Sequence, residues 1–178
     1  MNLPNKITMI RVILIPFFVF FMLTDFVPYS NVIAVAIFIV ASLTDTLDGY
    51  LARKYELVSN FGKFMDPLAD KLLVCSAMIA FIELDLIPAW IVIIIIAREF
   101  IISGFRLIAA EKNVVIAAGM SGKIKTTVQM LMCCLLIARL PFGFMRYVEQ
   151  IFIYATLVLT VYSLIVYLVQ NKDILRDN

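Results

Sequence analysis

The chain has 178 residues, of which 63% are apolar and 16% are charged, with a formal net charge of +2. Soluble domains contain about 45–50% apolar and about 25% charged residues. The composition therefore excludes an ordinary soluble globular protein and a disordered chain, and it favours an integral membrane protein. Histidine is absent from the sequence, which excludes a histidine base, metal ligand or covalent nucleophile.

Six membrane-spanning helices fit this length, because a span needs about 20 residues and the connections are then short. Turn signals such as Asp25 to Pro28 and Pro141-Phe-Gly143 separate the apolar segments. In chain order the predicted spans are Ile7–Leu23, Tyr29–Ala52, Asp66–Glu83, Pro88–Ala110, Gly122–Arg139 and Tyr147–Gln170. We expect an all-α integral membrane protein, a six-transmembrane-helix bundle in which residues 1–178 form a single membrane-embedded domain.

The distribution of Lys and Arg predicts the orientation of this bundle. With a cytoplasmic N-terminus, most basic residues outside the spans, from Lys6 to Arg176, fall on the cytoplasmic side, and Arg139 and Arg146 fall on the other. The positive-inside rule then places both termini in the cytoplasm. We expect a multi-pass protein of the cell (cytoplasmic) membrane.

Charged residues concentrate in one part of the chain, since nine of the 28 lie within 45–71. A charge inside a span costs at least about 2.5 kcal/mol and usually faces the bundle interior or a water-filled cavity. The charged residues deep in the predicted spans include Asp45, Asp48, Asp66, Asp70, Lys71, Arg98, Glu99 and Arg106. This concentration indicates a functional site near the cytoplasmic boundary.

Two pairs of aspartates dominate the cluster. Asp45 and Asp48 share a helical face at the end of the second span, and Asp66 and Asp70 share one at the start of the third, with Pro67 in its first turn. The short connection makes these helices antiparallel neighbours, so four carboxylates meet. Divalent cations would relieve their repulsion, and an all-oxygen site suits Mg²⁺, Mn²⁺ or Ca²⁺.

Salt bridges from the aspartates to Arg53, Lys63 and Lys71 are the structural alternative. That alternative does not require the paired spacing of the aspartates. In contrast, two hard cations bound by carboxylates are a common feature of the active sites of phosphoryl-transfer enzymes.

The run D-x2-D-G-x2-A-R-x8-G-x3-D-x3-D, from Asp45 to Asp70, resembles the signature of the CDP-alcohol phosphotransferases at all eight positions. The resemblance implies a six-helix membrane core, usually a homodimer, whose active site faces the cytoplasm. It also implies transfer of a phosphatidyl or similar group from a CDP-linked donor to an alcohol, with release of CMP.

The resemblance further implies roles for individual residues. Two divalent cations, Mg²⁺ or Mn²⁺, would be bound by Asp45, Asp48, Asp66 and Asp70, and Asp70 would also be the catalytic general base. The residues implied at the nucleotide site are Gly49, Ala52, Arg53 and Gly62, with Lys63 adding positive charge.

Three further segments, Asn2–Arg11, Ala97–Arg106 and Gly122–Gln129, resemble the phosphatidylglycerophosphate synthase branch of that family. The branch implies CDP-diacylglycerol as donor and glycerol 3-phosphate as acceptor. A phosphorylated acceptor needs fixed cations, because Arg and Lys bind phosphate by bidentate contacts and point charge. The candidates are Arg98, Arg106, Lys123, Lys125 and Arg11, and we expect Glu99 to orient Arg106. The alternatives are a salt bridge from Arg98 or Arg106 to Glu99, and anchoring of Lys123 and Lys125 at the cytoplasmic membrane surface.

The predicted mechanism is a direct displacement within a membrane-lipid environment, and we expect no nucleic-acid partner. Inositol phosphate or phosphatidylglycerol as acceptor is the alternative within the same chemistry. A divalent-cation transporter is an alternative of another class, although transporter sites tend toward the membrane midplane. A structural protein with salt-bridged helices would leave the spacing of the aspartates a coincidence.

Overall fold

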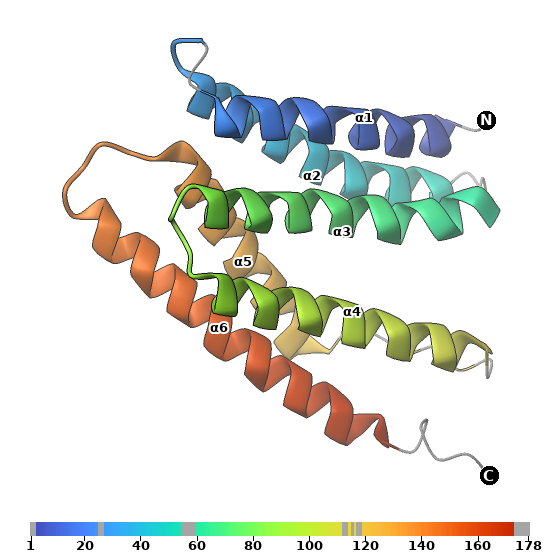
Figure 1. Ribbon diagram of the computed structural model, residues 1–178. Helices are drawn as coiled ribbons and strands as arrows, with labels where there is room; N and C mark the ends of the chain where they lie inside the picture. The colour runs from blue at the N-terminus through green and yellow to red at the C-terminus, as the bar shows by residue number, and fades with distance from the viewer. Residues whose placement is uncertain are drawn as a thin grey trace. The chain divides into compact units, whose positions relative to one another are not determined.

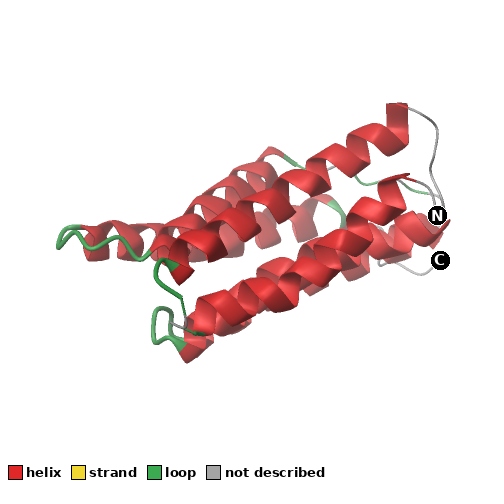
Figure 2. Cartoon of the chain, turned by 90° about the horizontal axis from the view of Figure 1, so that it is seen from above, coloured by secondary structure: helices red, strands yellow, loops and turns green. Residues whose placement is uncertain are grey.

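The computed structural model describes residues 3–24, 27–54, 60–111, 114, 116 and 119–172, with side chains at all of these except 3, 4, 45–54, 60–64, 66, 67 and 111. Over these described residues the chain forms six helices and no strand (Figures 1 and 2). The helices are α1 (Leu3–Leu23), α2 (Ser30–Lys54), α3 (Asn60–Glu83), α4 (Ala89–Glu111), α5 (Met120–Ala138) and α6 (Met145–Gln170).

The six predicted helices are all present, and their boundaries differ most at two N-terminal ends. Helix α1 begins at Leu3 instead of Ile7, and α3 begins at Asn60 instead of Asp66. The predictions started each helix at its apolar stretch, whereas a helix can continue into water by satisfying its own backbone hydrogen bonds. The placement of Pro67 in the first turn of the third helix is therefore wrong, because this residue lies well inside α3.

Two helical segments within the described ranges are long and apolar enough to cross a bilayer, Asn5–Leu23 and Met145–Gln170. A shorter apolar segment covers Ser30–Thr44. Large apolar side chains are exposed along the helices, and Phe17 and Phe20 on α1 are each about half exposed. Apolar surface on this scale is typical of contact with lipid or a partner. Six spans and cytoplasmic termini remain predictions.

The first of two compact units comprises residues 1–86 together with 136–139. Within it α1 packs against both α2 and α3 (Figure 1). The rings of Phe18 and Phe38, both fully buried, lie 5.6 Å apart between α1 and α2. Arg139 Nη2 donates to the carbonyl of Met22 at 3.2 Å, so the last carbonyls of α1 receive a charged partner.

Helix α3 ends in a turn that redirects the chain before α4. Asp85 has a φ of 54°, in the left-handed region that aspartate tolerates better than most residues. Its N–H donates to Ile82 O at 3.0 Å, and the Leu86 N–H donates to Phe81 O at 2.9 Å. These two bonds are those of a Schellman motif, which satisfies the otherwise unpaired carbonyls at a helix end.

The second unit comprises residues 87–135 and 140–178, and so contains α4, most of α5, and α6. Its core includes Ile102, Phe105 and Tyr167, with Leu164 and Leu168 packed against them. The rings of Phe105 and Tyr167 meet edge to face with centroids 6.0 Å apart. This aromatic pair is one of the contacts that pack α4 against α6.

Candidate functional site

The four aspartates of the signature lie on α2 and α3 of the first unit. Asp45 and Asp48 belong to the last turns of α2, and Asp66 and Asp70 to the N-terminal half of α3. Helical spacing keeps each pair on one face. Asp70 is half-buried, while the side chains of Asp45, Asp48 and Asp66 lie outside the described residues.

The predicted metal site therefore cannot be assembled from described side chains alone. Among those that are described, no group of three or more Cys, Asp or Glu side chains forms a possible metal site. The predicted nucleotide residues also belong to helices with side chains outside the described set: Gly49, Ala52, Arg53, Gly62 and Lys63. Their roles remain predictions.

A buried polar face of α1 lies in the same unit as the aspartates. Asn5, Thr8 and Arg11 recur every third residue on this helix and are all buried, Arg11 being 1% exposed. Arg11 Nε donates to Thr44 Oγ1 at 3.4 Å. Because Thr44 directly precedes Asp45, Arg11 brings a positive charge to the carboxylate-bearing end of α2.

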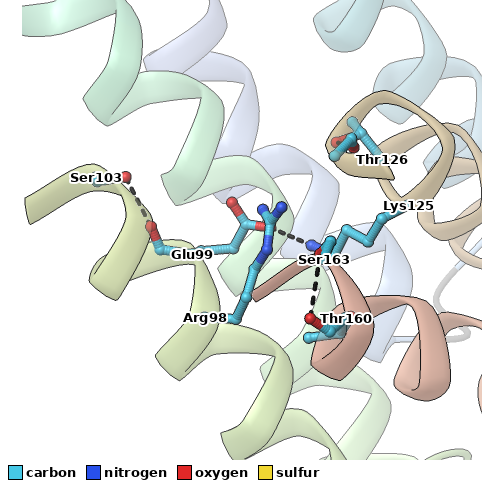
Figure 3. Close-up of polar contacts among 8 residues, drawn as sticks. Arg98, Glu99, Ser103, Lys125, Thr126, Thr160 and Ser163 are labelled. Atoms are coloured by element: carbon cyan, nitrogen blue, oxygen red, sulfur yellow. Dashed lines mark hydrogen bonds and ion pairs between the residues drawn. The ribbon is translucent and has the colours of Figure 1, made fainter. Parts of the chain in front are cut away.

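A buried ionic cluster in the second unit joins α4 and α5 (Figure 3). Lys125 Nζ donates to Glu99 Oε1, and Arg98 Nη1 donates to the same oxygen at 3.2 Å. Lys125 is fully buried and Arg98 is 7% exposed. Burying a charge is unfavourable unless it is paired. Within the described cluster, two cations share one carboxylate, which leaves an excess of positive charge.

Arg98 retains an unused donor in this cluster. Its Nε is buried and, within the described part of the chain, has no hydrogen-bond partner. A Cβ added to Gly122 would lie 3.5 Å from Arg98 Nη2, so the guanidinium lies beside the first turn of α5. A helix N-terminus has a partial positive charge. Arg98, Lys125 and this helix end therefore form a favourable environment for an anion.

The remaining predicted phosphate-binding residues are placed differently. Arg106 and Lys123 are exposed, and Arg11 belongs to the first unit. Lys123 and Lys125 are two residues apart, so they lie on opposite sides of α5. This explains why Lys123 is exposed and Lys125 is buried. The Glu99 carboxylate accepts hydrogen bonds from Arg98 and Lys125. Its expected role in orienting Arg106 stays a prediction.

A polar face of α6 was missed in the sequence interpretation, which assigned no function to the last span. The buried residues Thr156, Thr160, Ser163 and Tyr167 follow each other at intervals of four, three and four. Ser163 Oγ donates to Thr160 O at 3.1 Å. The side-chain oxygens of Thr156, Thr160 and Tyr167 have no hydrogen-bond partner within the described residues. The spacing itself could have revealed this face.

Comparison with known proteins places the chain among enzymes of lipid synthesis. A family model described as CDP-alcohol phosphatidyltransferase matches residues 1–162. The CDP-diacylglycerol–glycerol-3-phosphate 3-phosphatidyltransferase of Bacillus subtilis (strain 168) is 50% identical over 153 residues, which cover 79% of each chain.

Two relatives of the same name are similar over nearly their whole length. The protein of Haemophilus influenzae is 42% identical over 186 aligned residues, covering 99% of this chain and 97% of the relative. That of Shigella flexneri serotype 5b is 41% identical over 183, covering 99% and 98%.

Proposed function

Because the chain belongs to the CDP-alcohol phosphatidyltransferase family, we propose that it transfers a phosphatidyl group from CDP-diacylglycerol to sn-glycerol 3-phosphate. The products are phosphatidylglycerol phosphate and CMP. Both substrates appear in the names of the relatives, which align with almost the entire chain.

The observation that most supports a phosphorylated acceptor is the excess positive charge around Glu99. Arg98 and Lys125 are buried cations sharing one carboxylate, and Arg98 Nε has no partner within the described residues. A phosphate would provide the missing acceptor, and charge-assisted bonds of this kind are short and strong. We assign Arg98 and Lys125 as the principal phosphate-binding residues.

The other three predicted phosphate-binding residues, Arg106, Lys123 and Arg11, have auxiliary roles in this proposal. Arg106 and Lys123 are exposed, so they would act at the rim of the phosphate site and attract the dianion. Arg11 contacts Thr44, next to Asp45, and its charge would offset the carboxylates of the signature.

The donor set of the signature fits hard divalent cations. Asp45, Asp48, Asp66 and Asp70 offer only carboxylate oxygens, which suit Mg²⁺ or Mn²⁺ better than metals that prefer sulfur or nitrogen. Two such cations, when bound, neutralise the pyrophosphate of the donor and make CMP a better leaving group. We propose these four residues as the metal ligands.

Residues of the protein bind the donor and take up the proton that the acceptor loses. Arg53 and Lys63 bind the donor's phosphates, and Gly49, Ala52 and Gly62 leave room for the nucleotide. Asp70 accepts the proton from the primary hydroxyl of glycerol 3-phosphate. That oxygen bonds to the donor's β-phosphorus, and the bond from this phosphorus to the CMP oxygen breaks. CMP leaves with the electron pair on its phosphate.

The charge distribution and the apolar helices support a membrane setting. We propose a single membrane domain over 1–178, with both termini and the active site at the cytoplasmic side of the cell membrane. A homodimer is part of this proposal because the family resemblance implies one.

The acceptor assay tests the proposal directly. Purified protein in detergent with Mg²⁺ and CDP-diacylglycerol is offered glycerol 3-phosphate, inositol phosphate, serine or phosphatidylglycerol, and CMP release is measured. Release with glycerol 3-phosphate alone is expected. Release with none of the four, or only with another acceptor, would refute the assignment.

Two variants test the phosphate site itself. Arg98→Lys and Lys125→Met should raise the KM for glycerol 3-phosphate about 10- to 100-fold, as expected for a hydrogen bond to a charged group. The matched control is Arg146→Ala, since Arg146 is exposed and distant in sequence from the cluster. An unchanged acceptor KM in both test variants would place the phosphate elsewhere.

A further inference from the structure

The contact between Phe105 and Tyr167 determines which residues of α4 and α6 face each other. The two rings are 6.0 Å apart, and both helices run in the same direction (Figure 1). Seven residues make two turns and advance about 10 Å while returning to nearly the same face. Seven residues before Phe105 is Arg98, and seven before Tyr167 is Thr160. In the register set by this ring contact, Arg98 on α4 corresponds to Thr160 on α6.

Both residues have an unused polar atom at this level. Arg98 Nε and Thr160 Oγ1 are buried and have no hydrogen-bond partner among the described residues. The guanidinium nitrogen can only donate, whereas the hydroxyl can donate and accept. Unpaired buried polar groups are rare and usually indicate a partner such as water or a ligand. Figure 3 draws Thr160 on α6 together with Arg98 on α4 and Lys125 on α5.

The chemistry of the acceptor matches this pair of groups. Glycerol 3-phosphate has a phosphate at one end, a reacting primary hydroxyl at the other, and a secondary hydroxyl between them. With the phosphate at Arg98 and Lys125, the secondary hydroxyl lies one carbon further along the molecule. A neutral hydroxyl side chain is the partner it requires, because a hydroxyl both donates and accepts.

Resting on the proposed function, we propose that Thr160 binds the secondary hydroxyl of glycerol 3-phosphate and makes the site specific for it. A site that hydrogen-bonds a substrate hydroxyl rejects analogues that lack it, since its own polar group is then left unpaired. Thr160 is thus a specificity residue supplied by α6, separate from the cations on α4 and α5.

The same helix offers a matched control one turn away. Thr156 is as fully buried as Thr160 and its hydroxyl is also unpaired within the described residues. By the same alignment Thr156 lies level with the half-buried Ile94, which is flanked on α4 by the buried side chains of Ile91 and Ile95. No charged group of α4 lies at that level, so we expect no substrate contact there.

The test compares two acceptors in three variants. The probes are glycerol 3-phosphate and 3-hydroxypropyl phosphate, which keeps the phosphate and primary hydroxyl and lacks the secondary hydroxyl. In the wild type, the KM for the analogue should be about 3- to 10-fold higher, as one neutral hydrogen bond predicts. Thr160→Val should raise the KM for glycerol 3-phosphate by the same factor and abolish the discrimination. Thr160→Ser should restore it, and Thr156→Val should behave as wild type.

The outcomes separate this inference from the proposed function. If the wild type releases no CMP with glycerol 3-phosphate, the proposed function fails. If it does release CMP, and Thr160→Val still discriminates between the acceptors as the wild type does, only the role of Thr160 is overturned. If Thr160→Val does not fold, Thr160→Ala supplies the same comparison. An unchanged KM for CDP-diacylglycerol shows that the donor site is intact.

Discussion

Replacing Glu99 by glutamine perturbs the cluster between α4 and α5 at its only described carboxylate. The variant keeps the size of the side chain and an amide oxygen that can still accept a hydrogen bond. It removes the negative charge that Arg98 and Lys125 share. Two buried cations then remain next to each other without the carboxylate that compensates them, so the folded state is expected to lose stability.

The cost follows from burial. Removing one partner of a buried ion pair costs about 3–5 kcal/mol. The Glu99 side chain is 23% exposed, whereas that of Lys125 is fully buried. Most of the lost stability therefore comes from leaving the buried cations without a counter-charge. With the amide oxygen retained, we expect about 2–3 kcal/mol. For a chain of this size that corresponds to a fall in Tm of about 4–12 °C.

Glycerol 3-phosphate should restore part of this stability, because its phosphate supplies the missing negative charge beside the two cations. Thermal unfolding in detergent, followed by tryptophan fluorescence, is measured with and without saturating glycerol 3-phosphate. The rise in Tm caused by the ligand should be larger in Glu99→Gln than in the wild type, by mass action on a tighter site. Glu83→Gln, at an exposed position, is the control.

Either of two results would refute this reasoning. A Tm of Glu99→Gln equal to that of Glu83→Gln would mean that the carboxylate does not stabilise the buried cations. A ligand-induced shift smaller than in the wild type would mean that Glu99 holds Arg98 and Lys125 in place for the phosphate.

The remaining predictions concern the reaction, the core and a turn. Asp70→Asn should lower kcat at least about 100-fold through loss of the general base, with an unchanged Tm, and activity like the wild type would remove Asp70 from the mechanism. Chelation by EDTA should abolish CMP release, and added Mg²⁺ or Mn²⁺ should restore it; activity that survives chelation contradicts the metal site. Phe105→Ala should lower the free energy of unfolding by about 3–5 kcal/mol because it removes the ring that packs on Tyr167, as thermal unfolding would show. Asp85→Gly should raise the Tm by a few degrees, since glycine adopts a positive φ without strain, while Asp85→Val should lower it.

Local patterns in the sequence were sufficient to predict that the six helices exist, but they did not predict where each helix begins. Apolar stretches and turn residues predicted all six elements, but α3 begins at Asn60, in a segment where Gly62, Lys63 and Asp66 interrupt the apolar residues. Hydropathy reports where a chain prefers lipid, and a helix can extend beyond that limit as long as its backbone bonds are made.

The ion pair between Glu99 and Lys125 could not be predicted from local sequence, because it depends on how α4 and α5 pack. Spacing along α4 suggested Glu99 and Arg106 as partners and gave no sign of the bond from Lys125, 26 residues away in the sequence, to Glu99. Such a pairing requires the packing of two helices and cannot be inferred from one of them. The buried and exposed positions of Lys125 and Lys123 could have been predicted, because residues two apart on a helix face opposite sides.

The face formed by Thr156, Thr160, Ser163 and Tyr167 was missed for a different reason. Hydroxyl side chains change the average hydropathy of an apolar helix very little, so a search for spans registers only the apolar majority. Their intervals of four, three and four become visible only when polar residues are followed along one face.

The bond between Lys125 and Glu99 also has a consequence for how the chain enters a membrane. Helix α5 contains Lys123 and Lys125 and no acidic residue, so its buried lysine has no counter-charge on its own helix. Lys125 lies in the second turn of α5, so it opposes insertion of an isolated span by less than the about 2.5–3.5 kcal/mol of a central lysine. Because α4 is synthesised first, Glu99 is already available when α5 emerges from the ribosome. The two helices are therefore expected to enter the bilayer as a hairpin, and loss of Glu99 should appear in cells as a defect in biogenesis before any defect in catalysis.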